Sequence, residues 1–125
     1  MTTVYFDEKN LILTAKGHAE YSKDGEPDIV CASVSMLAYT LAENILNLPP
    51  FLFKKPPKIK LQSGDVEINC FAKDEYYKEI LKMFEFTLKG FSLLQYRYSK
   101  NVRIKECWYE IIGDYGTCKK IFTRN

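Results

Sequence analysis

Short apolar runs alternate with polar segments at the start of the chain. Residues 4–6 and 11–15 are rich in β-prone side chains, and they flank the polar segment 7–10. Two such runs separated by polar turn residues predict a β-hairpin. Residues 17–27 then carry no apolar periodicity and contain glycine and proline, so we expect a loop there.

A helix is predicted directly after this loop. Apolar residues recur with the 3.6-residue helical period over about five turns, at Val30, Val34, Leu37, Leu41, Ile45 and Leu48. Asp28 is a favourable N-cap, and Pro49 and Pro50 would end the helix. A second face of this helix has only small side chains, which favours close packing against a sheet or a partner subunit. These residues are Cys31, Ser35, Ala38 and Ala42.

The next part of the chain repeats this order of elements. Residues 59–61 and 66–71 are β-prone and flank the turn-forming segment 63–65, which predicts a second hairpin. Cys70 lies in the second of these runs, so we expect it to be a core residue of a strand. A second helical pattern covers residues 74–98. Gly90 lies inside this pattern, where glycine is unfavourable, and it therefore predicts a kink or a tight contact.

The last part of the chain completes the fold class. Residues 102–112 are strand-like, and residues 117–122 would return as a final strand after a turn at 113–116. The predicted order is ββαββαβ(β). This order is typical of an α+β fold with two helices packed on a mostly antiparallel sheet. A length of 125 residues corresponds to one domain.

Composition and charge limit the function classes. Apolar residues make up 46% and charged residues 27%, as in ordinary globular domains, and the net charge is only +2. That charge gives no basic surface for nucleic acid or for an anionic membrane. The first ten residues are charged rather than signal-like, and no run of 18 apolar residues is present. We therefore expect a cytoplasmic protein that binds neither a membrane nor nucleic acid directly.

Histidine and cysteine narrow the chemistry further. The chain has one histidine, His18, and four cysteines, at Cys31, Cys70, Cys107 and Cys118. No two cysteines have C-x-x-C spacing, so we expect no metal site, and no other cofactor is predicted. Imidazole chemistry at neutral pH would have to use His18.

His18 and Cys31 are the residue types of a catalytic pair. His18 follows a predicted strand, and Cys31 lies in the first turn of the predicted helix. Free N–H groups and the positive end of the helix dipole favour a thiolate at that position. The loop between the two residues is long enough to bring their side chains together. The alternative is a polar histidine at a strand end and a small packing cysteine.

The local sequence resembles the ribosomal-processing cysteine protease family, Prp. Residues 17–19 read G-H-A, and residues 28–35 read D-I-V-C-A-S-V-S after a short glycine-containing loop. The family pattern is G-H-A, a flexible loop and D-I-V-C-A-A-V-S, so Ser33 stands where alanine is usual. A weaker match follows at residues 90–96, and the resemblance covers about residues 3–104.

The resemblance implies roles for four residues. His18 would be the general base and Cys31 the nucleophile of a Cys-His dyad. Asp28 would either orient His18 or only cap the helix, and Ser35 would either touch the site or only pack. N–H groups of the first helical turn, including that of Cys31, would stabilise an oxyanion.

The resemblance also implies a substrate and an assembly. The family removes a short N-terminal extension from a bacterial large-subunit ribosomal protein, cutting next to a phenylalanine, and it forms homodimers. A loop with Glu20, Tyr21 and Gly25 would close over the bound peptide. The chain would be one Prp-like domain, residues 1–125, with a C-terminal extension at about 105–125. That extension would extend the sheet, cover the site or adapt the protein to another substrate.

Two other functions remain open at this point. One is a protease of the same family that processes phage capsid or scaffold proteins. The other is a dimeric binding protein that keeps the fold without catalysis. A thiol-reactive probe that labels Cys31 much faster than Cys70 would favour an enzyme over a binding protein.

Overall fold

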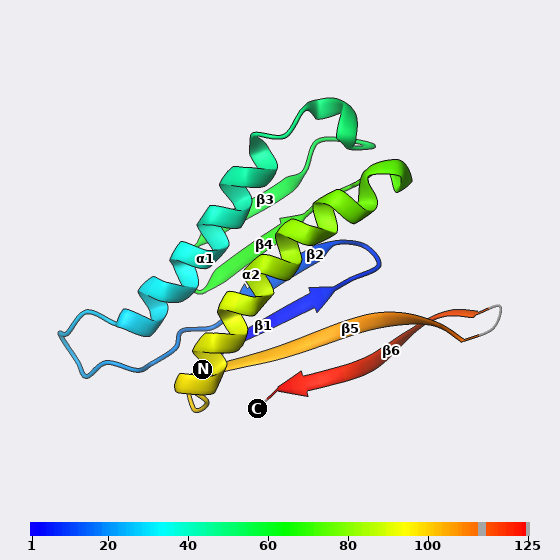
Figure 1. The fold of residues 1–125 in the computed structure, drawn as a ribbon. Coiled ribbons are helices and arrows are strands. Elements are labelled where there is room, and N and C mark those ends of the chain that lie inside the picture. Colours follow the sequence, from blue (N-terminus) through cyan, green and yellow to red (C-terminus); the bar gives the residue numbers. More distant parts are fainter. Residues whose placement is uncertain (113–114, 125) are drawn as a thin grey trace.

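Strands and helices follow the predicted order along the chain (Figure 1). The computed structural model describes the backbone of residues 1–112 and 115–124 and the side chains of residues 1–105. The strands are β1 (Thr2–Asp7), β2 (Ile12–Lys16), β3 (Lys58–Gln62), β4 (Asp65–Asn69), β5 (Val102–Ile112) and β6 (Tyr115–Arg124). The helices are α1 (Ile29–Leu46) and α2 (Tyr77–Arg97), and short 3-10 turns lie at Pro50–Leu52 and Asp74–Tyr76.

The strands form one mixed sheet in the order β3-β4-β2-β1-β5-β6. Neighbouring strands are antiparallel except for β1 and β5, which run parallel. The two helices run in opposite directions on the same face of this sheet (Figure 1). The predicted α+β fold, with two helices packed on a mostly antiparallel sheet, is confirmed.

The core lies between the helices and the sheet face that they cover. Alternate strand residues point into it, and each helix contributes one buried stripe. The largest fully buried side chains include Phe6, Leu13, Ile68 and Ile104 from the sheet and Leu41, Ile45, Ile80, Phe84 and Phe91 from the helices. The Phe6 and Phe84 rings stack with their centroids 5.4 Å apart, which joins β1 to α2.

The two helices contact closely at the glycine of α2, as the sequence predicts. A Cβ atom at Gly90 would lie 2.6 Å from Cδ2 of Leu37. Glycine inside a helix costs about 1 kcal/mol relative to alanine. The hydrogen at this position leaves room for the leucine of α1, so the helices pack at short range.

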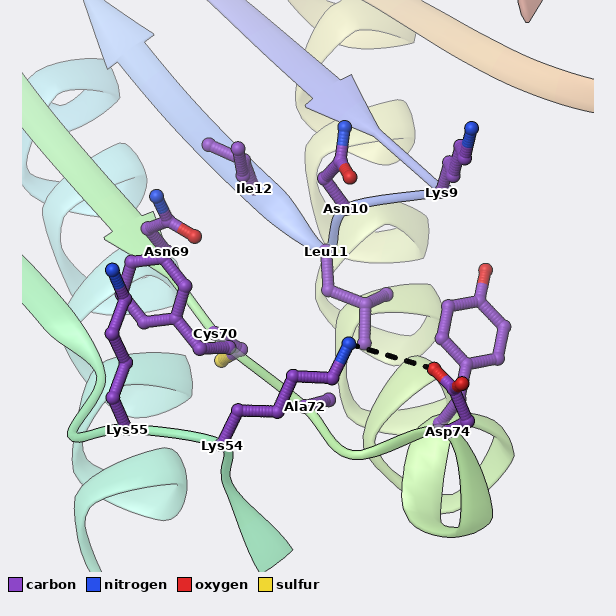
Figure 2. A pocket seen from close by; sticks show the side chains of 12 residues that line it. Lys9, Asn10, Leu11, Ile12, Lys54, Lys55, Asn69, Cys70, Ala72 and Asp74 are labelled. Atoms are coloured by element: carbon purple, nitrogen blue, oxygen red, sulfur yellow. Dashed lines mark ion pairs between the residues drawn. The ribbon is translucent and has the colours of Figure 1, made fainter. Parts of the chain in front are cut away.

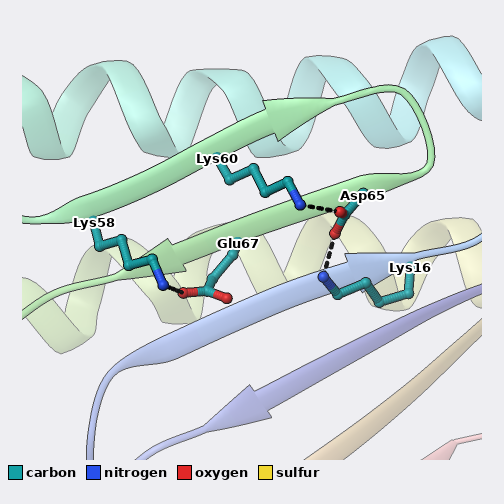
Figure 3. Close-up of polar contacts among 5 residues, drawn as sticks. All are labelled: Lys16, Lys58, Lys60, Asp65 and Glu67. Carbon is teal, nitrogen blue, oxygen red and sulfur yellow. Dashed lines mark hydrogen bonds and ion pairs between the residues drawn. The ribbon is translucent and has the colours of Figure 1, made fainter.

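The face of the sheet opposite the helices carries ion pairs across three strands (Figure 3). Asp65 of β4 pairs with Lys16 of β2 and with Lys60 of β3. Glu67, farther along β4, pairs with Lys58 at 3.6 Å. The two lysines beside Asp65 hold the pKa of its carboxyl group below the usual value. These pairs tie the end of β2 to the β3–β4 hairpin.

Three local predictions need correction. Cys70 is buried as expected, but β4 ends at Asn69, so Cys70 lies beyond the strand. α1 ends before Leu48, because the chain turns away after its C-cap. β6 begins at Tyr115, inside the predicted turn, and residues 113–114 lie outside the described residues. In each case the residue type fits the predicted element, but contacts elsewhere in the fold determine where that element begins or ends.

The C-terminal segment extends the sheet, which was one of the three possibilities predicted for it. β5 pairs with β6 in antiparallel register, with an irregularity between Glu106 and Trp108. β6 is an edge strand, separated from β2 by β1 and β5. Three strand spacings correspond to about 14 Å, so the backbone of β6 does not cover the end of β2.

No unbroken run of 18 apolar residues is present, because polar residues such as Glu43 and Asn44 interrupt α1, but the mean hydropathy of this helix is high. Among the described residues, α1 is long and apolar enough to cross a membrane by length and composition. A core helix of a soluble protein passes the same test. The buried stripe of α1 has six residues in the core of this fold, so the apolar character of α1 has a structural explanation.

Candidate active site

The chain leaves β2 through a sharp bend at Gly17. Its φ of +89° is in the left-handed region that favours glycine, and a Cβ atom there would lie 2.4 Å from the carbonyl oxygen of Met1. The Gly17 N–H donates to the carbonyl of Gly64 at 2.9 Å. The Thr2 hydroxyl donates to the carbonyl of Gly17 at 3.1 Å. These contacts fix the backbone immediately before the histidine.

His18 is exposed at this bend and lies against the turn between β3 and β4. A Cβ atom on Gly64 would lie 2.7 Å from His18 Nε2 and 2.8 Å from its Cε1. Within residues 1–105, no side chain or backbone group forms a hydrogen bond with the imidazole. The ring is therefore accessible to a substrate and is packed on one side.

Cys31 lies in the first turn of α1, as the sequence predicts, and its side chain is half-buried. The Ala19 N–H donates to its Sγ atom at 3.3 Å. Because Ala19 follows His18 directly, covalent geometry places the His18 Cα within about 6 Å of that sulfur. The structure thus brings the two predicted catalytic residues to one place, although no hydrogen bond joins their side chains.

The backbone beside the thiol is held by a residue from the other end of the chain. Asn101 precedes β5, and its side-chain Nδ2 donates to the carbonyl of Ala19 at 2.9 Å. Ala19 itself is buried, with 1% of its surface exposed. The next residue, Glu20, has a φ of +57°, a conformation that non-glycine residues seldom adopt. Asn101 therefore fixes the point where the loop leaves the site.

Asp28 joins the helix to this loop through four backbone N–H groups. Its Oδ1 accepts from Val30 and Cys31 at 3.0 Å each, and its Oδ2 accepts from Tyr21 at 2.8 Å and from Ser22 at 3.2 Å. Partial burial opposes ionisation, but these four bonds outweigh it and lower the pKa of the carboxyl group. The carboxylate is an N-cap and a loop anchor, and within residues 1–105 the imidazole is not among its hydrogen-bond partners.

The same contacts overturn one expectation about the oxyanion. The N–H groups of Val30 and Cys31 already donate to Asp28. The N–H of Ala32 donates to the Asp28 carbonyl at 3.0 Å, within the helix. These first-turn donors are therefore occupied in this structure, because the N-cap that starts the helix also takes the groups predicted to hold an oxyanion.

The remaining predicted residues lie around this centre. Tyr21 packs edge-on against Tyr98 at the end of α2, with ring centroids 5.1 Å apart. Gly25 lies at the outer part of the loop, and a Cβ atom there would meet nothing within 4 Å. Ser35 lies one turn after Cys31, half-buried, and within residues 1–105 its hydroxyl has no hydrogen-bond partner. The loop is thus anchored at Tyr21 and open farther out.

Two residues of this site were missed by sequence reasoning. Gly64 lies 46 positions after His18, and Asn101 lies 82 positions after Ala19. The turn signal at Ser63-Gly64-Asp65 predicts a hairpin but does not indicate what the hairpin contacts. Asn101 has no local signal at all, because its role depends on the parallel pairing of β1 with β5.

A cavity of about 330 Å³ lies at the other end of the sheet (Figure 2). It is lined by the β1–β2 turn, the residues after β4 and Lys54, which pairs with Asp74 at 3.6 Å. Cys70 also lines it, and burial raises the pKa of this thiol to about 12. A thiol with that pKa stays protonated at neutral pH and is a poor nucleophile. The cavity contains neither His18 nor Cys31, and it is separate from the site.

The described residues contain no group of three or more histidine, cysteine and acidic side chains that could hold a metal ion. What they do contain is a thiol at a helix N-terminus, a backbone N–H that contacts it, and an accessible imidazole nearby. This combination is typical of enzymes that cleave acyl bonds through a cysteine nucleophile.

Comparisons with known proteins give the same class. Residues 1–103 match the family model of the cysteine protease Prp, and the chain belongs to that family. The protein is accordingly a cysteine protease by family. A search of the curated proteins found no match.

Solved structures share this fold. The ribosomal processing protease Prp of Staphylococcus aureus with a covalently linked product peptide is 23% identical, with a TM-score of 0.67. The same protease with a substrate peptide is 22% identical, with a TM-score of 0.62. Each match covers 85% of this chain and 99% of the other chain. A Streptococcus mutans protein is 24% identical, with a TM-score of 0.58, over 84% of this chain and 94% of its own.

Proposed function

We propose that this protein is a cysteine endopeptidase that uses a Cys31–His18 dyad. It removes a short N-terminal extension from a bacterial large-subunit ribosomal protein. The observation that carries the proposal is the N–H of Ala19 against Cys31 Sγ, because it brings the nucleophile next to the residue that follows His18. The similar Staphylococcus aureus structures, a ribosomal processing protease with a substrate or product peptide, support the substrate class.

The chemistry follows from these groups. His18 takes the proton of the Cys31 thiol, and the thiolate attacks the scissile carbonyl carbon of the peptide. The tetrahedral intermediate collapses to an acyl-enzyme while the imidazolium returns the proton to the leaving amine. Water, deprotonated by His18, then releases the new carboxylate and restores the thiol. The Ala19 N–H stabilises the negative charge on sulfur before attack.

The loop would bind the peptide from outside. Asp28 and Tyr98 anchor it at Tyr21, whereas its outer part around Gly25 is exposed. Glu20 follows the anchored Ala19 and is exposed, so its side chain is available to a substrate. A loop fixed at its base and open farther out can close over a peptide without moving the thiol. Ser35, on the thiol side of α1, would line the inner end of this space.

Peptide cleavage by purified protein tests the proposal. The substrate spans the N-terminal extension of the ribosomal protein, with phenylalanine before the cut, and a matched peptide has that phenylalanine replaced by alanine. We expect cleavage of the first peptide next to the phenylalanine and much slower cleavage of the second. Mass spectrometry of the products locates the cut. Cleavage of capsid or scaffold peptides alone would favour the phage alternative.

Site variants test the dyad. Cys31→Ser should lower kcat/KM by about a thousandfold or more, and His18→Ala by about a hundredfold or more. Cys70→Ala is the matched control, because it removes a thiol that lies outside the site. Full activity in Cys31→Ser would refute the mechanism. Tight peptide binding without cleavage by the wild-type protein would favour a binding protein.

Assembly and location are part of the same proposal. We expect a homodimer, which light scattering coupled to size-exclusion chromatography would measure. We also expect a cytoplasmic location, where thiols stay reduced and Cys31 therefore remains a free thiol. Fractionation of cells that express the tagged protein would test the location.

A further inference from the structure

Gly64 meets two separate requirements in the turn between β3 and β4. Its φ of +73° is in the left-handed region, where side chains other than glycine are strained. The space beside it is also filled, because a Cβ atom would lie 2.7 Å from Nε2, 2.8 Å from Cε1 and 3.3 Å from Cδ2 of His18. Three ring atoms lie this close, so the imidazole packs directly against the backbone of the turn.

The turn and the histidine are also joined through their backbones. The carbonyl of Gly64 accepts the Gly17 N–H at 2.9 Å, one residue before His18. Asp65, which follows Gly64 and begins β4, pairs with Lys16 and Lys60 (Figure 3). Lys16 and Asp65 are also register partners across β2 and β4. Displacing the turn would therefore displace the histidine with it.

From these contacts we propose that Gly64 is a positioning residue for His18. The turn closes one side of an imidazole that is otherwise exposed, which reduces the rotamers open to the ring before a peptide binds. A Cβ atom at this position would overlap the ring and force it out of the place that it occupies in the structure. The proposal rests on the proposed role of His18 as the base.

The single histidine makes the position of the ring directly measurable. His18 is the only histidine in the chain, so its imidazole gives the only histidine Cε1–H signal in a proton–carbon NMR spectrum. Gly64→Ala adds the Cβ atom at a positive φ. Gly64→Asn adds the same atom, but asparagine tolerates positive φ better, so it keeps the test valid where the alanine variant folds poorly.

Two controls separate the ring contact from other effects. Gly25→Ala has the same backbone strain, with a φ of +82° and nothing within 4 Å of the new Cβ atom, and it serves for thermal stability only. Ser63→Ala changes the adjacent, exposed residue of the turn without adding an atom against the ring. We expect Gly64→Ala and Gly25→Ala to lose similar thermal stability.

The two Gly64 variants should differ from Ser63→Ala in the site itself. We expect a changed chemical shift of the His18 Cε1–H signal. We also expect a kcat at least about tenfold lower than that of wild type, with KM changed less than about twofold. A shifted pH profile of kcat/KM should accompany this loss. Wild-type signals and a kcat/KM within twofold of wild type in both variants would overturn the proposal. If the wild-type protein cleaves no peptide, the proposed function fails, whereas the NMR displacement still decides the positioning.

Discussion

Replacing Asp28 separates the two structural roles of one carboxylate. Oδ1 caps α1 by accepting from Val30 and Cys31, and Oδ2 holds the loop by accepting from Tyr21 and Ser22. Asp28→Ala removes both sets of bonds. Asp28→Ser keeps an oxygen that caps the helix but does not reach both loop N–H groups.

The magnitudes follow from these bonds. Loss of an N-cap costs about 1 kcal/mol. The two loop bonds are partly exposed, and at about 0.5 kcal/mol each they contribute about 1 kcal/mol more. Asp28→Ala should therefore lower the free energy of unfolding by about 2 kcal/mol, and Asp28→Ser by about 1 kcal/mol. For a domain of this length each 1 kcal/mol lowers Tm by about 4 °C.

Urea unfolding followed by circular dichroism measures both losses. Asp24→Ala is the matched control, because Asp24 is an exposed aspartate of the same loop, and its unfolding free energy should stay within about 0.5 kcal/mol of wild type. An unfolding free energy of Asp28→Ser equal to that of wild type would refute the loop-anchoring role, and equal losses for Asp28→Ala and Asp28→Ser would refute the capping role. An equally large loss of unfolding free energy in Asp24→Ala would show that removing any negative charge from the loop destabilises the protein.

The pH dependence gives a second check on Asp28. Its pKa is lowered in the folded protein, so its contribution is present above the unfolded value of about 3.9 and is lost as the pH falls through the folded pKa. The difference between wild type and Asp28→Ala should therefore shrink below about pH 4. A difference that stays constant on acidification would contradict the assignment of these bonds to an ionised carboxylate.

Three further predictions concern packing and thiol reactivity. Gln95 is buried and accepts the Ile104 N–H at 2.7 Å. Gln95→Leu should therefore lower the free energy of unfolding, measured in urea, by about 1–3 kcal/mol. A loss below about 0.5 kcal/mol would contradict the importance of this hydrogen bond. Gly90→Ala should lower Tm because its Cβ atom would overlap Leu37. Adding Leu37→Ala should restore part of the lost Tm. A rise in Tm in Gly90→Ala alone would show that α1 can move aside. Iodoacetamide at pH 7 should alkylate Cys31 before Cys70, since burial raises the Cys70 pKa to about 12, and equal rates by peptide mapping would contradict this.

Periodicity and capping chemistry predicted most of the local structure. The apolar repeat from Val30 to Ile45 and the N-cap at Asp28 define α1, because both signals are local and agree with each other. Gly90 was recognisable as a tight contact because glycine is costly inside a helix. Cys70 was predicted to be buried but was placed in a strand, since an apolar run does not show where a strand ends.

The geometry of the site depends on contacts that no local pattern contains. The motif predicted His18 and Cys31, but only the folded sheet shows that Ala19 contacts the sulfur and that Gly64 contacts the imidazole. The role of Asn101 follows from the parallel pairing of β1 with β5, which joins the two ends of the chain. Pairings this distant in sequence are decided by the whole core rather than by any window of residues.

The start of β5 separates a stretch of the chain that contacts the candidate site from a stretch that extends the sheet away from it. Asn101 holds the loop at Ala19, and its own carbonyl accepts the Thr2 N–H at 2.8 Å, so the residue that directly precedes β5 belongs to the site. The family match ends at residue 103, whereas β5 continues to Ile112, about 30 Å farther along the sheet. A peptide tag inserted after Ile112 would therefore leave the spacing of histidine and thiol unchanged. By the same reasoning, the part of β5 beyond residue 103 and all of β6 can change in length and sequence without changing the spacing of His18 and Cys31.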